Sequence, residues 1–363
     1  MDCSSIIPDV NYSGFSARLH REVASKRIPA GGSIDLTSRC NLRCVHCYVR
    51  SSTRQQELSL AEIERIFDEL SAAGCLWLLL TGGEPLLRPD FSEIYLLAKK
   101  KGFLINLFTN AVLVNEDIAA MLAEWRPFAV EVTLYGATAE TYERVTGVPG
   151  SFRRCLDGIN LLRDKNIPLR FKSMLLTINS HELGRMMALA ESLGGEFRYD
   201  GNIHGHLGGS REPCRFRLTP EQILELDVAD SRRIDALREF LRFSSQFTRD
   251  PKRIYHCGAG INSFHIDSQG RLCLCMLSRR ESFDLCTGTF AEGWQEFLAR
   301  VRFQETKGAN ACAACKLYDL CGQCPGWGEI EDGDPEQSSE FLCRLAHLRS
   351  AVLGGEIFPD SPD

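Results

Sequence analysis

The sequence lacks the features that mark membrane, exported and nucleic-acid-binding proteins. No apolar stretch reaches the roughly 18 residues of a transmembrane helix, and no apolar signal-peptide core follows Met1. The formal net charge of -6 and a pI near 5.8 exclude a global basic field for nucleic acid or an anionic membrane. Internal repeats and low-complexity tracts are also missing. We therefore expect a cytoplasmic protein with neither a nucleic-acid partner nor a membrane partner.

Cysteine, in contrast, is abundant, with 16 residues in a chain of 363. Disulfides are rare in a reducing cytosol, where cysteine clusters more often bind metals or take part in catalysis. The stretch "LTSRCNLRCVHCYVR" places Cys40, Cys44 and Cys47 close together. A structural zinc site needs four ligands, and His46 lies between two of these cysteines, where the chain is too short to turn its imidazole onto a shared metal. The triplet therefore predicts a [4Fe-4S] cluster with one open iron; the alternative is three buried cysteines acting as small apolar side chains.

The spacing C-x3-C-x2-C directly after the strand-like segment "GSIDLT" resembles the signature of the radical S-adenosylmethionine (radical SAM) enzymes. The resemblance implies that Cys40, Cys44 and Cys47 bind the cluster and that its open iron chelates the amino and carboxylate groups of S-adenosylmethionine. Reduction of the cluster would then cleave the sulfonium and give a 5′-deoxyadenosyl radical. The resemblance also places His46 near the adenine.

The pattern from residue 32 to about 200 alternates short apolar runs with amphipathic stretches. We expect strands at 33–37, 76–80, 103–108, 128–134, 169–176 and 196–200. We expect helices at 59–74, 90–101, 115–124, 151–165 and 180–193. Repeats of this kind predict an α/β fold with a parallel sheet, but six strands are too few to close an eight-stranded barrel. The expectation is a partial (β/α)6 radical SAM barrel with its site at the carboxyl ends of the strands.

Beyond Asp200 the pattern changes into a Gly-rich loop and two polar helical stretches, 219–227 and 231–244. From His256 onward cysteines are dense and the expected elements are short; "FHIDSQGRLCLC" predicts a hairpin that presents Cys275. The expected segments are an N-terminal extension at 1–31, the barrel at 32–200, a loop and helical bridge at 201–255, a small Cys-rich α+β domain at 256–348 and a C-terminal tail at 349–363.

Motifs along the barrel resemble elements that contact S-adenosylmethionine in radical SAM enzymes. "TGGEP" follows the second strand, where two glycines let backbone approach a ligand, and in the family this motif binds the methionyl amino group. "LFTN" and "VTLYG" end the third and fourth strands, and the resemblance places the hydroxyl of the latter at the ribose. An arginine in "TYERVTG" would pair with the methionyl carboxylate or lie on the surface, and a serine in "FKSMLLT" would face adenosine or pack on a helix. The candidate cofactor-binding residues are His46, Gly82, Gly83, Glu84, Pro85, Thr109, Asn110, Thr133, Arg144 and Ser173.

A second group of cysteines resembles the SPASM extension of radical SAM enzymes that modify peptides and proteins. The resemblance implies two auxiliary [4Fe-4S] clusters: a distal one held by Cys312, Cys315, Cys321 and Cys343, and a proximal one held by Cys257, Cys275 and Cys324. Fully ligated relatives have one more cysteine shortly after the first, but residues 258–263 contain none. The proximal cluster therefore has an open iron or recruits Cys214, Cys273 or Cys286. The alternative is two zinc sites, since Cys-x2-Cys pairs also bind zinc.

Cys214 follows the Gly-rich loop at the expected mouth of the barrel, where it is a candidate catalytic general acid or a cluster ligand. The resemblance implies a maturase of ribosomally synthesised peptides that forms thioether or carbon–carbon crosslinks oxidatively. Alternatives are sulfatase formylglycine maturation, tetrapyrrole modification, or a non-catalytic zinc-stabilised binding protein.

The expected partners are a peptide or protein substrate and a reductant such as flavodoxin or ferredoxin. About thirty residues precede the first expected strand, enough for one amphipathic helix and less than a small domain. Leader recognition would therefore come from a separate protein or from the barrel and SPASM surfaces.

Overall fold

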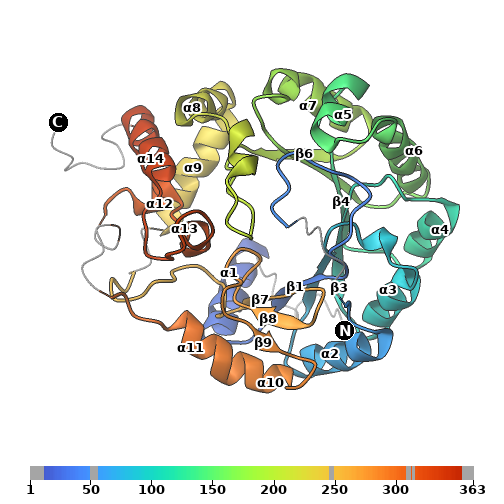
Figure 1. Cartoon of the computed structure of the whole chain (residues 1–363), viewed down its shortest axis with the longest axis horizontal. Coiled ribbons are helices and arrows are strands. Elements are labelled where there is room, and N and C mark those ends of the chain that lie inside the picture. Colours follow the sequence, from blue (N-terminus) through green and yellow to red (C-terminus); the bar gives the residue numbers. More distant parts are fainter. Residues whose placement is uncertain (1–11, 50–55, 245–248, 308–311, 313–314, 354–363) are drawn as a thin grey trace, which may run out of the picture.

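A nine-stranded sheet in the order β6-β5-β4-β3-β2-β1-β7-β8-β9 forms the centre of the molecule (Figure 1). The computed structural model describes residues 12–49, 56–244, 249–307, 312 and 315–353. The predicted segments 1–31 and 349–363 extend outside these residues. In the described part of the chain no helix is both long and apolar enough to cross a membrane.

The first six strands are parallel neighbours in chain order, and each lies within two residues of its predicted bounds. They are β1 Gly31–Asp35, β2 Trp77–Thr81, β3 Leu104–Thr109, β4 Ala129–Thr133, β5 Leu169–Met174 and β6 Glu196–Asp200. The strands are accurately predicted because each is a short apolar run bounded by turns. The partial (β/α)6 barrel is thus confirmed.

Six helices cover the outer face of these strands (Figure 1). They are α2 Leu60–Ala72, α3 Phe91–Lys100, α4 Glu116–Glu124, α5 Ala139–Thr146, α6 Ser151–Asp164 and α7 Leu183–Ser192. Helix α2 follows the N-cap Ser59, whose hydroxyl accepts from the amide of Glu62 in a capping box. Helix α5, absent from the predicted set, is capped by Thr138 and ends at Gly147 in the left-handed region.

Side chains alternate along the barrel strands between the helix layer and the interior. Leu107 and Val132 face the helices and are at most 1% exposed. Glu131 and Lys172 occupy intervening positions and remain partly open. The helix side of the sheet is therefore an apolar core, whereas the interior carries polar and charged groups.

Three short strands extend the sheet beyond β1, and their pairing with the barrel sheet is not predicted from the sequence. Strand β7, Ser263–Ile266, pairs parallel to β1, and β8, Arg271–Cys273, and β9, Phe283–Asp284, follow in antiparallel pairs. The β7–β8 pair confirms the predicted hairpin. Strand β1 consequently has a neighbour on both sides.

A polar network joins β7 to β1 inside the barrel. His265 Nδ1 lies 2.8 Å from the Ser33 hydroxyl, and its Nε2 lies 3.3 Å from the Asp35 carboxylate. Arg279, which follows β8, donates to the same carboxylate at 2.9 Å. Because His265 is fully buried, these contacts tie the C-terminal region to the first barrel strand.

Short helices make up most of the remaining chain, and α14 packs against α8 and α12. These helices are α1 Tyr12–Ser25, α8 Pro220–Ala229, α9 Ser231–Ser244, α10 Phe290–Glu292, α11 Leu298–Arg302, α12 Tyr318–Cys321, α13 Pro325–Asp332 and α14 Glu340–Leu353. A π-helical turn at Gly293–Phe297 joins α10 to α11, and 3-10 turns lie at Pro85–Leu87, Ser180–Glu182 and Glu212–Phe216.

Candidate active site

The loop that carries the first three cysteines follows β1 and is held by helix α5. The amide of Arg43 donates to the carbonyl of Thr146 at 2.8 Å, and the amide of Val45 donates to the carbonyl of Val145 at 3.0 Å. These bonds join positions about one hundred residues apart in the chain. Backbone groups of the barrel therefore fix the loop at the carboxyl end of the strands.

Cys40, Cys44 and Cys47 are all close enough to Tyr135 for their charge to affect its hydroxyl. Burial raises the pKa of Tyr135 well above its usual value, and charge on each of the three thiols raises it further. Burial also raises the pKa of Cys40 to about 11, so its thiol is protonated at neutral pH until a metal binds. The predicted triplet is thus grouped in space, with Cys40 exposed at the opening.

The two glycines of the TGGEP motif pack directly against the backbone of this loop. Gly83 donates its amide to Thr37 at 2.8 Å. A Cβ on Gly82, whose φ is +138°, would meet the carbonyl of Thr37, and one on Gly83 would meet the carbonyl of Arg39, both inside 3.0 Å. Glycine is therefore needed here for the approach of two backbone segments, in addition to the predicted approach of a ligand.

Glu84 is fully buried and organises the ends of β2 and β3. Its carboxylate accepts from Thr109 Oγ1 at 2.8 Å, from the amide of Asn110 at 2.8 Å and from the amide of Leu86 at 3.2 Å. Burial raises its pKa to about 7, although these donors act in the opposite direction. Pro85 opens the adjoining 3-10 turn. The structure thus brings the predicted residues 82–85, Thr109 and Asn110 into one neighbourhood.

His46 and Thr133 both interact with Tyr135. The imidazole of His46 is 8% exposed and meets the Tyr135 ring edge-on at 4.8 Å between centroids. Burial lowers its pKa to about 4, so the ring is neutral at pH 7. Thr133 hydrogen-bonds to the Tyr135 hydroxyl. Both predicted residues are therefore close to the cysteine triplet.

Ser173 packs toward a helix and Arg144 lies on the surface, which is the second of the two alternatives predicted for each residue. Ser173 is 3% exposed, and its hydroxyl points to the carbonyl of Met174 and the sulfur of Met186 on α7. We therefore do not assign Ser173 to the cofactor site, because strand alternation turns it toward the helices. Arg144 is exposed in the last turn of α5, and its carboxylate-binding role stays a prediction.

The distal cysteines group as the resemblance implies. Burial raises the pKa of Cys321 to about 12, and the charges of Cys343, Cys312 and Cys315 add to that shift. The same four cysteines line one cavity, together with Tyr318, Ser339 and His347. Four thiols around one cavity fit the ligand set of an iron–sulfur cluster.

The proximal cysteines form a separate group. Burial raises the pKa of Cys275 to about 11, and charge on Cys324 and Cys257 raises it further. Charge on Cys275 in turn contributes to the raised pKa of Cys273. Among the described residues, no three His, Cys, Asp or Glu side chains are close enough together to hold a metal ion. The assignment of the distal and proximal cysteine groups therefore depends on which thiols lie near one another.

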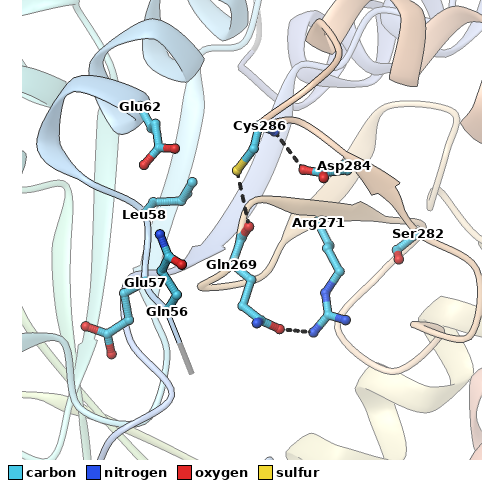
Figure 2. A pocket seen from close by; sticks show the side chains of 9 residues that line it. All are labelled: Gln56, Glu57, Leu58, Glu62, Gln269, Arg271, Ser282, Asp284 and Cys286. Atoms are coloured by element: carbon cyan, nitrogen blue, oxygen red, sulfur yellow. Dashed lines mark hydrogen bonds between the residues drawn. The ribbon is translucent and has the colours of Figure 1, made fainter. Parts of the chain in front are cut away.

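Cys273, Cys214 and Cys286 are the candidates for the fourth ligand of the proximal cluster, and the last two have different surroundings. Cys286 lies in a pocket with Glu62 and Asp284, where its thiol points to the carbonyl of Gln269 at 3.6 Å (Figure 2). Cys214 lies 3.5 Å from the carboxylate of Glu331 and 2.8 Å from the guanidinium of Arg217. Of the three suggested residues, Cys273 has a proximal cysteine, Cys275, among the charges that raise its pKa.

Comparison with known proteins supports this geometry. Residues 34–190 match the family described as the Radical SAM superfamily. The AdoMet-dependent heme synthase of Methanosarcina barkeri is 36% identical over 162 residues, 44% of this chain and 46% of that protein, so the chain matches less than half of its length. The mycofactocin maturase MftC of Mycobacterium ulcerans is 29% identical over 300 residues, 80% of this chain and 81% of that protein.

A solved structure has the same fold. Streptococcus suis SuiB bound to its precursor peptide SuiA superposes with a TM-score of 0.69 at 16% identity, covering 93% of this chain and 82% of that chain. The fold match therefore includes the region beyond the barrel. Residues 34–190 thus form a radical SAM domain, the kind of domain that uses S-adenosylmethionine and an iron–sulfur cluster, and the chain is an enzyme.

Proposed function

We propose that this enzyme modifies a peptide oxidatively, forming a thioether or carbon–carbon crosslink. The observation that carries the proposal is the pair of separate cysteine groups beyond the barrel, 312/315/321/343 and 257/275/324. Similarity to a maturase over 80% of the chain, and a shared fold with a protein solved with its precursor peptide, support the same substrate class. Two auxiliary [4Fe-4S] clusters at these positions would accept the electron that the oxidised substrate loses.

Within the barrel, Cys40, Cys44 and Cys47 would hold the cluster that supplies a 5′-deoxyadenosyl radical from S-adenosylmethionine. The methionyl amino group would be bound by Gly82, Gly83 and Glu84. Thr109 and Asn110 would hold the Glu84 carboxylate in place, and Pro85 would begin the adjoining turn. His46 would pack on adenine and Thr133 would bind the ribose. Each of these residues belongs to the neighbourhood of Tyr135 or Glu84 described above.

The proximal cluster would have an open iron or take Cys273 as its fourth ligand. A cytoplasmic location would give access to a flavodoxin or ferredoxin as reductant. A separate leader-recognition protein would deliver the peptide. These partners follow from the need for single electrons and for a specific peptide among many.

The proposal is tested by anaerobic reconstitution with iron and sulfide, followed by reduction with S-adenosylmethionine present. Wild type should form 5′-deoxyadenosine, and the triple variant Cys40→Ala, Cys44→Ala, Cys47→Ala should form none while keeping about two thirds of its iron. Cys286→Ser, outside all three groups, is the control and should match wild type. A Cys-rich peptide encoded beside the gene should lose two hydrogen atoms per crosslink. Zinc in place of iron in the triple variant would contradict the auxiliary clusters.

Tetrapyrrole modification is a second candidate, because the heme synthase is 36% identical over 162 residues. That similarity spans less than half of either chain, whereas the similarity to the maturase covers 80% of this chain and 81% of the maturase. The same reconstituted enzyme separates the two functions. Turnover of an iron porphyrin with no change in the peptide mass would favour tetrapyrrole chemistry.

A further inference from the structure

Lys172 faces the interior of the barrel at the centre of β5. Its neighbours Phe171 and Ser173 are buried toward the helices, and Ser173 contacts Met186 on α7. Alternation along the strand therefore turns Lys172 the opposite way. Although it lies deep in the protein, 27% of its side-chain surface is still accessible. The side chain consequently faces the barrel interior and stays partly accessible there.

The surroundings of Lys172 provide one acid and one aromatic face. Its Nζ lies 3.9 Å from the carboxylate of Glu131 on β4 and 2.7 Å from the ring centroid of Phe108 on β3. Thr133 on β4 and Arg198 on β6 are its register partners in the adjacent strands. Arg198 is itself paired with Glu196 at 3.2 Å. Lys172 is thus next to the strand position expected to contact the ribose.

These contacts leave Lys172 able to exchange a proton near neutral pH. Burial lowers its pKa to about 7, and Glu131 is the charged group that opposes this shift. Arg170, the preceding inward position, is directed away and covers the ring of Phe128. An ordinary lysine has a pKa of about 10.4 and is almost entirely protonated at pH 7. A substantial neutral fraction makes Lys172 suited to general base catalysis.

We propose that Lys172 accepts the proton that the substrate loses during oxidation in the barrel, with Glu131 stabilising the ammonium that results. This inference rests on the proposed function. Joining a C–H carbon to a thiol sulfur removes two hydrogen atoms. One leaves as a hydrogen atom to the 5′-deoxyadenosyl radical; the other leaves as a proton to Lys172 Nζ and an electron to an iron–sulfur cluster. The carbon–sulfur bond forms as the C–H and S–H bonds break, so atoms and electrons balance.

The state of the amine is tested first, without clusters or substrate. Protein is acetylated with limiting acetic anhydride between pH 6 and 10, and each lysine is quantified by mass spectrometry. The reactivity of Lys172 should reach half of its maximum near pH 7, about three pH units below the ordinary lysine value. Glu131→Gln should lower the midpoint of Lys172 further. An unreactive Lys172, or one that titrates like an ordinary lysine, would overturn the proposal.

The proton transfer is tested with the Cys-rich peptide and reconstituted enzyme. Lys172→Met should lower crosslinked peptide per 5′-deoxyadenosine about 100-fold, while Lys165→Met should leave that ratio unchanged. Propylamine should restore part of the ratio in Lys172→Ala, because it refills the site with a base. An unchanged ratio and pH profile in Lys172→Met would disprove the role. Absence of 5′-deoxyadenosine from wild type would count against the proposed function instead, and the acetylation result would still decide the inference.

Discussion

The cysteine loop of the barrel and the distal cysteine region differ in what holds them. Bonds from Arg43 and Val45 to α5 fix the loop across the fold. In the distal region, Cys315, Tyr318 and Cys321 donate their amides only three or four residues back along the chain, and α12 has four residues. Local turns resist opening weakly. The comparison predicts that the barrel loop keeps its structure without metal, whereas the distal region would depend more on the proposed cluster.

Iron removal should give the largest effect. After chelation, residues 315–324 should lose nearly all hydrogen-exchange protection, while β2 to β4 keep theirs, because metal binding and folding are coupled at such sites. Cys321 adds a pH effect. Its folded pKa of about 12 exceeds the reference value of 9, so its contribution to apo stability is complete below pH 9 and is lost as the pH rises toward 12. Equal protection in both regions after chelation would remove the distinction.

A smaller effect should follow from disturbing the backbone packing of the barrel site. Gly83→Ala should destabilise the fold by about 2–4 kcal/mol, since its methyl group would meet the carbonyl of Arg39. Gly184→Ala is the matched control: its Cβ meets nothing within 4 Å in α7, so it should stabilise the helix by about 0.5–1 kcal/mol. Thermal unfolding measures both. Equal shifts would mean that the Gly-Gly contact does not hold the loop.

The smallest effect is expected at Cys214. Serine keeps a donor beside Glu331 and Arg217, so Cys214→Ser should change stability by less than about 1 kcal/mol and leave the yield of 5′-deoxyadenosine unaltered. Glu331→Ala, which removes the carboxylate paired with the mostly buried Arg217 guanidinium, should cost about 3–5 kcal/mol. Loss of iron or of crosslinked peptide in Cys214→Ser alone would restore Cys214 as a cluster ligand or general acid.

Much of the barrel could be predicted because its signals are local. Each strand is a short apolar run, and the C-x3-C-x2-C and TGGEP motifs each occupy a few consecutive residues. The phase of alternation in β5 could not be read from "LRFKSMLL", where polar and apolar residues do not alternate cleanly. That ambiguity led to Ser173 in place of Lys172.

Long-range pairing was the other part beyond prediction. Nothing in "SFHI" indicates that it pairs with β1, because any exposed strand edge offers the same backbone groups. The role of Glu84 as an acceptor for Thr109 and Asn110 also depends on which strands lie side by side. The sequence did contain an indication of this contact. Glu84 comes after β2, and Thr109 and Asn110 lie at the end of β3; the carboxyl ends of neighbouring parallel strands meet at one edge of the sheet.

The pairing of β1 with β7 has a consequence for synthesis on the ribosome. Strand β1 ends at Asp35 and β7 begins at Ser263. At ~5–20 residues per second, the roughly 230 intervening residues take about 10–50 s to translate. During that time one edge of β1 has no native partner, and an open strand edge promotes pairing with other chains. The yield of folded enzyme is therefore decided while the nascent chain is still growing, before any iron is inserted.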